Sequence, residues 1–335
     1  MRTFKKILTT TVILLVVLSL VGCGDVINYT PENPTISTGE LPFLIAHGGG
    51  NKEFPDNTLE AFYNAYSVDK NVVMETDVNM TSDGVIILSH DTTLDRKTNM
   101  SGAIIDWSYA DLIAEEVNFG YHNPTKDGQL AGERKIYTDG YGNEKSPLDV
   151  EYPEGVSPRH DTVFLATTLE ELLTAFPDNI ISVEIKQEGE VGMRALKATL
   201  ALVREHDAFD RVIFASFHSE IYDELVRLDE SGEVPDTFLY SPCIGGVVKY
   251  VVLSVIGLDY FFRDGIGVLQ IPTEEYGIPL DFERLVNVAH KHNIGVQYWT
   301  VNDKDEMRHL IEIGADGIMT DYPHRLAEVY AEYSK

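Results

Sequence analysis

Cysteine and basic residues are both scarce in this chain. Only two of its 335 residues are cysteine, Cys23 and Cys243, so a framework of several disulfides is excluded. Lysine and arginine together number 26 against 54 aspartates and glutamates, which gives a formal net charge of −28 at pH 7. A field of this sign repels nucleic acid and attracts cations. We therefore expect no nucleic-acid partner.

Apolar runs long enough to span a bilayer are also missing. A spanning helix needs about 20 consecutive apolar residues; residues 7–21 form a shorter run, and residues 245–262 are interrupted by charged side chains. Residues 1–22 instead resemble a lipoprotein signal peptide. Its marks are the basic residues Arg2, Lys5 and Lys6 before the apolar run and Leu20-Val21-Gly22-Cys23 after it, which resembles a bacterial lipobox.

Lipidation is the expected fate of Cys23. Cleavage before Cys23 would leave the protein lipid-anchored on the extracytoplasmic face of the cell membrane, because buried acyl chains supply the anchoring free energy. An uncleaved anchor is the alternative. Only Cys243 then remains, and we expect it to be a small buried side chain. Residues 23–41, with several Pro, Ser, Thr and Gly, are expected to form a flexible tether to a domain over residues 42–335.

The rest of the chain has the pattern of a parallel α/β fold, because apolar, β-branched runs alternate with helix-like segments. The spacing predicts eight barrel strands and hence a TIM (β/α)8 barrel. A ninth run, residues 85–89, follows the turn signal Asp83-Gly84, so we expect it to fold back as a β-hairpin on the second strand. The predicted barrel strands are residues 43–47, 72–78, 180–186, 211–216, 237–241, 267–271, 295–300 and 317–320.

Helix boundaries are also indicated. Asn57 is expected to cap the helix after the first strand, with Glu60 completing a capping box. Residues 168–176 are predicted to form another helix, and residues 281–292 and 303–313 show helical apolar spacing.

Two segments depart from the barrel pattern. Residues 121–163, rich in Gly, Pro and Tyr, are predicted to be an inserted loop on the catalytic side, either a lid or a surface elaboration. Residues 245–262 are apolar nearly throughout, and we expect a buried barrel helix there. An interfacial surface that lies on lipid is the alternative.

Charged side chains stand at the ends of the predicted strands. Alternate residues of a strand share a face, so Glu75 and Asp77 point the same way, as do Glu184 and Lys186. The carboxyl ends of the strands meet at one mouth of a barrel. These side chains are therefore expected to converge there, together with His47 at the end of the first strand and His90 after the hairpin.

The residue types favour metal-assisted phosphodiester chemistry. Glu75, Asp77 and Glu184 offer only oxygen ligands, which suit Ca²⁺ or Mg²⁺ as the divalent cation, whereas zinc prefers histidine or cysteine. Histidines titrate near neutrality and can transfer protons. Lys186 is expected to contact the phosphate, although it could instead neutralise Glu184.

The order of these motifs resembles the glycerophosphodiester phosphodiesterase family. The resemblance covers residues 43–325 with one expanded region. It rests on Leu44-Ile45-Ala46-His47, Pro55-Asp56-Asn57-Thr58-Leu59-Glu60-Ala61-Phe62, Glu75-Thr76-Asp77-Val78, Thr81-Ser82-Asp83-Gly84, Ser89-His90-Asp91, Leu94-Asp95-Arg96-Lys97-Thr98, Glu184-Ile185-Lys186, Ser216-Phe217, Trp299-Thr300-Val301-Asn302 and Gly314-Ala315-Asp316-Gly317.

The resemblance implies a phospholipase C-like barrel that hydrolyses glycerophosphodiesters to sn-glycerol 3-phosphate and an alcohol. His47 and His90 would then be the catalytic residues, one as general base and the other as general acid. Trp299 would line the pocket against the glycerol carbons, or would be a core aromatic, and Gln270 is a weaker substrate-binding candidate. The partner is a small glycerophosphodiester or a lipid-derived substrate, and the sequence indicates no oligomeric state.

One position departs from the family pattern, which usually has arginine directly after the first histidine. Here Gly48 stands there, followed by Gly49 and Gly50. Arginine makes bidentate phosphate contacts that glycine cannot make, but backbone N–H groups of a glycine run can line an anion site. We therefore include Gly48 among the expected substrate-binding residues.

Three functions fit these observations. The first is the hydrolysis of small glycerophosphodiesters. The second keeps the chemistry but acts as a lysophospholipase D-like enzyme, or as a phosphodiesterase of a glycerol-phosphate polymer at the cell surface. The third is a catalytically silent surface binding protein on the same barrel, which only Gly48 favours.

Overall fold

Eight parallel strands form a nearly closed barrel in the computed structural model, which describes residues 33–39 and 41–333. Neighbouring strands follow the order β8-β7-β6-β2-β1-β13-β12-β9. This confirms the predicted TIM barrel. The strands are β1 (Phe43–Ala46), β2 (Val73–Met80), β6 (Ile181–Ile185), β7 (Val212–Ala215), β8 (Leu239–Tyr240), β9 (Val268–Pro272), β12 (Gly295–Trp299) and β13 (Gly317–Thr320).

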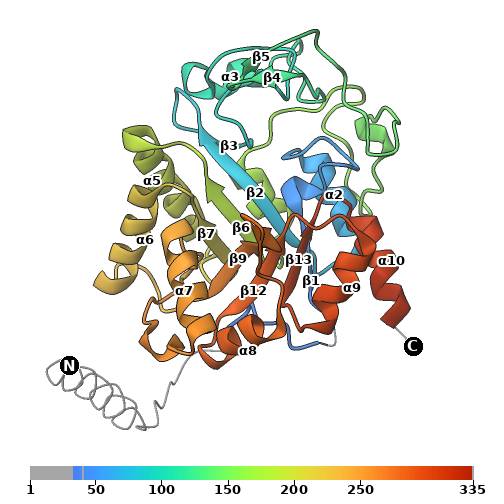
Figure 1. Cartoon of the computed structure of the whole chain (residues 1–335). Helices are drawn as coiled ribbons and strands as arrows, with labels where there is room; N and C mark the ends of the chain where they lie inside the picture. Colours follow the sequence, from blue (N-terminus) through green and yellow to red (C-terminus); the bar gives the residue numbers. More distant parts are fainter. Residues whose placement is uncertain (1–32, 40, 334–335) are drawn as a thin grey trace, which may run out of the picture. The chain divides into compact units, whose positions relative to one another are not determined.

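Helices alternate with these strands and cover the outside of the sheet (Figure 1). Buried apolar residues fill the space between helices and sheet, and a separate buried cluster of Ile45, Val73 and Met319 lies on the opposite face of the strands. The helices are α2 (Leu59–Val68), α3 (Tyr109–Leu112), α4 (Leu169–Ala175), α5 (Gly189–Glu205), α6 (Ser219–Ser231), α7 (Ile244–Ile256), α8 (Glu283–Lys291), α9 (Lys304–Glu312) and α10 (Pro323–Tyr333).

The predicted hairpin is present as β3 (Ile86–Leu88), which pairs antiparallel with the end of β2. Gly84 adopts φ +87° in the turn between them, a conformation that favours glycine. The hairpin brings the chain back to the barrel mouth, where Ser89 N–H donates to the carbonyl of Asp77 at 2.8 Å. This return places His90 beside the end of β2.

The start of α2 differs from the prediction. The N-cap is Thr58, whose hydroxyl accepts from Ala61 N–H at 3.3 Å. Asn57 instead has φ +61° and points to β2, where its Oδ1 accepts from the Thr76 hydroxyl at 2.7 Å. Glu60 is buried and paired with Arg159 at 3.4 Å. The capping box predicted from Asn57 and Glu60 was therefore wrong, whereas Thr168 does cap α4 as part of a capping box.

The insertion over residues 121–163 carries the small hairpin β4 (Thr125–Lys126) and β5 (Gln129–Leu130) and lies beyond the β2–β3 hairpin (Figure 1). It is attached to the barrel by specific contacts. The Tyr137 hydroxyl donates to the Asn51 carbonyl at 2.9 Å, and Arg159 binds Glu60 and also Glu171 of α4, the latter at 3.1 Å.

Residues 33–39 lie against the barrel, although they were expected in the tether. Asn33 Nδ2 donates to the carbonyls of Gly267 and Asn293, both at 2.7 Å, and Ser37 N–H donates to Asp316 Oδ1 at 3.0 Å. Residues 33–39 therefore contact the domain that was predicted to begin at residue 42. Residues 1–32, with the predicted signal peptide and Cys23, lie outside the described residues.

Helix α7 is not the buried barrel helix that we expected over residues 245–262. Only Tyr250 and Ser254 of this helix are buried, and an apolar face that includes Val248 and Val252 is exposed. Within residues 33–39 and 41–333, no helix combines the length and apolarity needed to cross a bilayer.

Candidate active site

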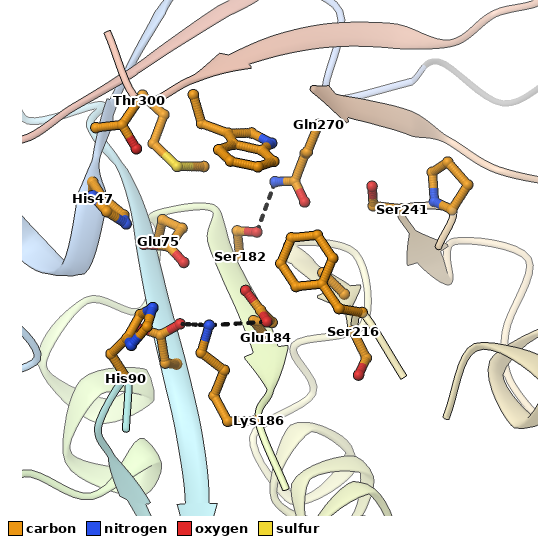
Figure 2. A pocket seen from close by; sticks show the side chains of 16 residues that line it. His47, Glu75, His90, Ser182, Glu184, Lys186, Ser216, Ser241, Gln270 and Thr300 are labelled. Carbon is orange, nitrogen blue, oxygen red and sulfur yellow. Dashed lines mark hydrogen bonds and ion pairs between the residues drawn. The ribbon is translucent and has the colours of Figure 1, made fainter. Parts of the chain in front are cut away.

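A pocket of about 290 Å³ opens at the carboxyl ends of the strands (Figure 2). The six charged or titratable side chains predicted to converge there all line it: His47, Glu75, Asp77, His90, Glu184 and Lys186. Trp299 and Gln270 line it as well, whereas Gly48 lines a smaller adjoining cavity of about 150 Å³.

Glu75, Asp77 and Glu184 form a compact carboxylate cluster. Strand register explains it, because Asp77 of β2 lies opposite Glu184 of β6 and Glu75 lies two residues before Asp77 on the same face. One ligand atom from each lies within 4.8 Å of the others. Burial, followed by the charge of Asp77, raises the pKa of Glu75 to about 7. Such a crowded, buried, all-oxygen set fits a hard divalent cation.

Lys186 lies between two of these acids. Its Nζ is 3.0 Å from Asp77 Oδ1 and 3.0 Å from Glu184 Oε1 (Figure 2). Burial opposes the charge on the ammonium, but the two carboxylates outweigh burial and raise the pKa of Lys186 above its usual value. Lys186 therefore stays charged and offsets part of the negative charge of the cluster.

His47 follows β1 and is oriented by a carboxylate. Its Nδ1 is 2.7 Å from Asp321 Oδ1, and Asn302 Nδ2 donates to Asp321 Oδ2 at 2.7 Å. Burial disfavours the imidazolium, but the hydrogen bond to Asp321 and the charges of Glu75, Asp321 and Asp77 raise the pKa of His47 to about 9. Because Nδ1 is engaged, Nε2 is the nitrogen left for a ligand in the pocket.

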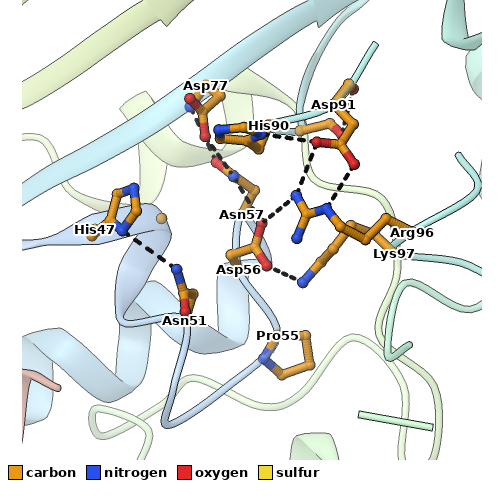
Figure 3. Close-up of polar contacts among 12 residues, drawn as sticks. His47, Asn51, Pro55, Asp56, Asn57, Asp77, His90, Asp91, Arg96 and Lys97 are labelled. Carbon is orange, nitrogen blue, oxygen red and sulfur yellow. Dashed lines mark hydrogen bonds and ion pairs between the residues drawn. The ribbon is translucent and has the colours of Figure 1, made fainter. Parts of the chain in front are cut away.

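His90 has the same kind of support on the other side of the acids. Its Nδ1 is 2.8 Å from Asp91 Oδ1. Asp91 in turn accepts from Arg96 Nε at 2.6 Å and from its terminal nitrogen at 3.1 Å (Figure 3). Burial raises the pKa of Asp91, but His90 and Arg96 outweigh it and hold that pKa well below its usual range. Each candidate histidine thus has an ionised aspartate behind it.

Sequence reasoning gave no role to Asp321, Asn302 or Arg96. Asp321 directly follows the predicted strand 317–320, so its place at a strand end was a usable signal. Asn302 and Arg96 belong to motifs that carried the family resemblance, but nothing in the sequence indicated that they hold the partners of the two histidines.

Gly48 does not offer its backbone N–H to the pocket. That N–H donates to Glu75 Oε2 at 2.9 Å, so the idea that it binds phosphate lacks support in this geometry. The glycine run has a steric basis instead. Gly48 has φ +53°, and a Cβ there would lie 2.9 Å from Asp56 Cβ. The corresponding Cβ atoms of Gly49 and Gly50 would lie 2.8 Å from Ala61 and 2.7 Å from Pro323.

Gly48→Arg is therefore expected to lower both stability and activity. A side chain at φ +53° costs about 1–2 kcal/mol, the new Cβ collides with Asp56, and any shift of the Gly48 N–H weakens its bond to Glu75. Chemical denaturation and kcat/KM on glycerophosphocholine measure the two effects. Gly142→Arg is the matched control, because Gly142 has φ +86° with nothing within 4 Å and should lose stability only. A raised kcat/KM in Gly48→Arg would contradict the steric explanation.

The wall opposite the histidines carries aromatic and amide side chains. Trp299, at the end of β12, and Phe217, just after β7, pack edge to face with ring centroids 6.1 Å apart. Gln270 of β9 donates to Ser182 Oγ at 2.9 Å and to Gln297 Oε1 at 3.1 Å. Trp299 thus lines the pocket as predicted, while its contact with glycerol stays a prediction.

A comparison with known proteins identifies the family of this chain. Residues 47–325 match the model of the glycerophosphoryl diester phosphodiesterase family. The chain belongs to this family. The predicted family resemblance is confirmed, and membership makes the protein a phosphoric diester hydrolase.

Individual family members are similar over most of their length. A glycerophosphodiester phosphodiesterase of Bacillus altitudinis is 22% identical over 293 residues, which cover 86% of this chain and 98% of that protein. Among solved structures, the glycerophosphoryl diester phosphodiesterase domain of a Mycobacterium tuberculosis protein has a TM-score of 0.62 at 18% identity, covering 87% of this chain and 99% of that one. A phosphodiesterase of Oleispira antarctica, solved in complex with the product sn-glycerol-3-phosphate, has a TM-score of 0.58 at 20% identity and covers 88% and 98%. These structures support the barrel fold.

Proposed function

We propose that the protein hydrolyses glycerophosphodiesters to sn-glycerol 3-phosphate and an alcohol, with a divalent cation and two histidines. The observation that carries this proposal is the arrangement of His47 and His90 with Glu75 between them (Figure 2). Each histidine is backed by its own aspartate. Family membership and the product bound to the Oleispira antarctica relative support the same substrate class.

The reaction exchanges one P–O bond for another. A hydroxyl oxygen, from water or from the neighbouring glycerol hydroxyl of the substrate, attacks phosphorus, and the P–O bond to the alcohol breaks. One histidine accepts the proton of the attacking hydroxyl and the other donates a proton to the departing alcohol. If the glycerol hydroxyl attacks, the product is a cyclic phosphate, and water then opens it in a second step.

The surrounding residues position these groups. Asp321 and Asp91 fix the rings through Nδ1, so that Nε2 of each histidine exchanges the proton. Lys186 directs two of its donors at Asp77 and Glu184, which leaves a third N–H for a phosphoryl oxygen. A Ca²⁺ or Mg²⁺ ion held by Glu75, Asp77 and Glu184 would stabilise negative charge on the phosphoryl oxygens.

The assay that tests this function is the release of sn-glycerol 3-phosphate from glycerophosphocholine. The protein, stripped of metal with a chelator, should be inactive and should regain activity with Ca²⁺ or Mg²⁺. Folded protein that releases no product with either ion would favour the silent binding protein. Full activity in the stripped protein would refute the need for a cation.

For localisation, the proposal is a lipoprotein anchored outside the cytoplasm through Cys23. Its support is the sequence of residues 1–23 alone. Cys23→Ala should move the protein from the membrane fraction to the soluble fraction or stop its processing, because the acyl anchor would be missing. Cys243→Ala is the matched control and should stay membrane-bound. A processed Cys23→Ala protein that remains fully membrane-bound would refute the lipid anchor.

A further inference from the structure

The apolar face of α7 lies beside the catalytic pocket. This helix carries a single charged residue, Lys249, and its side chains at Ile244, Val248 and Val252 are exposed. The three residues are spaced four apart, so they form one stripe along the helix. Contiguous exposed apolar surface, when it is extensive, marks protein-binding sites, lipid-binding sites or ligand-binding grooves.

The stripe forms one side of a groove of about 400 Å³. The other side is the small hairpin of β10 (Glu274–Glu275) and β11 (Ile278–Pro279) with the turn residue Tyr276. The groove is lined mainly by apolar side chains, and Glu275 is the only charged residue among them. Its volume lies in the range of small-molecule sites, roughly 300–1,000 Å³.

The groove adjoins the active site. Four residues line both cavities: Phe217, Pro242, Gln270 and Trp299. The opening between them coincides with the seam of the barrel, since no pairing among the described strands joins β8 to β9. Pro242 follows β8 and Gln270 lies on β9. A ligand that passes Trp299 at this seam would therefore extend from the carboxylates and histidines into the groove.

We propose that this groove binds the hydrocarbon chain of a single-chain glycerophosphodiester, a substrate of the lysophospholipid class. The inference rests on the proposed phosphodiesterase function and names its substrate class. The phosphodiester would lie among the charged residues of the pocket, and the chain would leave past Trp299 along Val248 and Val252. The bonds exchanged are the same: the P–O bond to the head-group alcohol breaks, an oxygen from water replaces it, and the products are an acylglycerol phosphate and the alcohol.

A hydrocarbon chain accounts for the apolar groove, which a small glycerophosphodiester would not occupy. Glycerophosphocholine would fill the polar pocket and leave the groove empty. Each buried methylene group, by contrast, should tighten binding by up to about fourfold. The charge of the lining also favours a chain over a peptide, because the described groove offers one carboxylate and no cation to pair with polar backbone or side chains.

Helix α7 itself supplies a matched control. Val248 and Val252, which line the groove, are 55% and 50% exposed, and Val255 and Ile256, which do not line it, are 53% and 59% exposed. Replacing both members of either pair by glutamine makes the same helix more polar by a similar amount. A lipid surface pressed against α7 would depend on both pairs, whereas a chain in the groove depends on the first pair alone.

The experiment measures kcat/KM on glycerophosphocholine and on lysophosphatidylcholines of increasing chain length, below their critical micelle concentrations. For the wild type, efficiency should rise with chain length. Val248→Gln/Val252→Gln should lose tenfold or more on the longer substrates and keep its activity on glycerophosphocholine. Val255→Gln/Ile256→Gln should match the wild type on both. Equal chain-length profiles in all three proteins, or an equal loss in both variants, would overturn the proposal.

Binding separates a failure of this inference from a failure of the proposed function. If the wild type hydrolyses neither substrate, the proposed function fails, and calorimetry with decylphosphocholine below its critical micelle concentration still tests the groove. Wild type and Val255→Gln/Ile256→Gln should bind this probe alike, and Val248→Gln/Val252→Gln at least tenfold more weakly. No binding to the wild type, or equal binding to all three, would refute the groove as a chain site.

Discussion

Alanine in place of Glu75, Asp77 or Glu184 is expected to abolish phosphodiester hydrolysis through loss of the cation. Each substitution removes one carboxylate from a cluster whose ligand atoms lie within 4.8 Å of one another, and a site built from oxygen ligands loses affinity with each one removed. Calorimetric titration with Ca²⁺ or Mg²⁺ should show binding to the wild type and clear loss in each variant. Glu188→Ala, an exposed acid outside the cluster, should bind the ion normally.

The stability of the metal-free protein offers a second measurement of the cluster. Burial and Asp77 raise the pKa of Glu75 from 4.5 to about 7, so the folded protein holds this proton more tightly than the unfolded chain. Without the cation, the contribution of Glu75 to the free energy of unfolding should therefore fall as the pH rises from about 4.5 to 7. Added cation should restore stability above pH 7.

For the alanine variants, unchanged affinity for Ca²⁺ or Mg²⁺ in all three would refute the metal site.

His47→Ala and His90→Ala are each expected to lower turnover by a factor of about 10²–10⁴, the usual range of general acid–base catalysis. Both act on one proton-transfer sequence, so the double variant should lose far less than the product of the single losses. Turnover on glycerophosphocholine, with circular dichroism to check the fold, gives the measurement. His309→Ala serves as the control, because the exposed side chain of His309 contacts Asp281 and lies outside the pocket.

Near-normal turnover in either folded histidine variant would contradict the paired mechanism. If the loss of turnover in the double variant equals the product of the two single losses, the histidines do not act on one shared step, even if both single variants are slow.

Much of the site could be predicted because it follows from strand periodicity. Glu75, Asp77, Glu184 and Lys186 occupy alternate positions in two strands, and parallel pairing with Asp77 opposite Glu184 brings them together. The partners of the histidines were harder to find. Asp321 is distant in sequence from His47, and only the closure of β13 onto β1 makes them neighbours. No local sequence pattern predicts that β13 pairs with β1.

Two predictions were wrong because the outcome depends on contacts with distant segments. Asn57 and Thr58 are both good N-cap residues. The choice between them depends on β2, where Asn57 accepts a hydrogen bond from the Thr76 hydroxyl and donates one to Asp77 Oδ2. For residues 245–262, apolar composition indicated burial, but burial of a helix depends on what packs against it. Here the face of α7 that carries Val248 and Val252 has the groove beside it, and no element among residues 33–39 and 41–333 covers it.

The seam between β8 and β9 affects how rigid the barrel is. Elsewhere, backbone hydrogen bonds hold each strand at a fixed spacing from the next. At the seam, contact depends on side chains such as Leu239, which packs so closely on Gly267 that a Cβ there would lie 2.5 Å from its Cδ2. We expect this side of the barrel to yield more readily than the others, because no pairing among the described strands would have to break. If the groove binds hydrocarbon chains as proposed, activity should therefore change gradually with chain length, with no sharp upper limit.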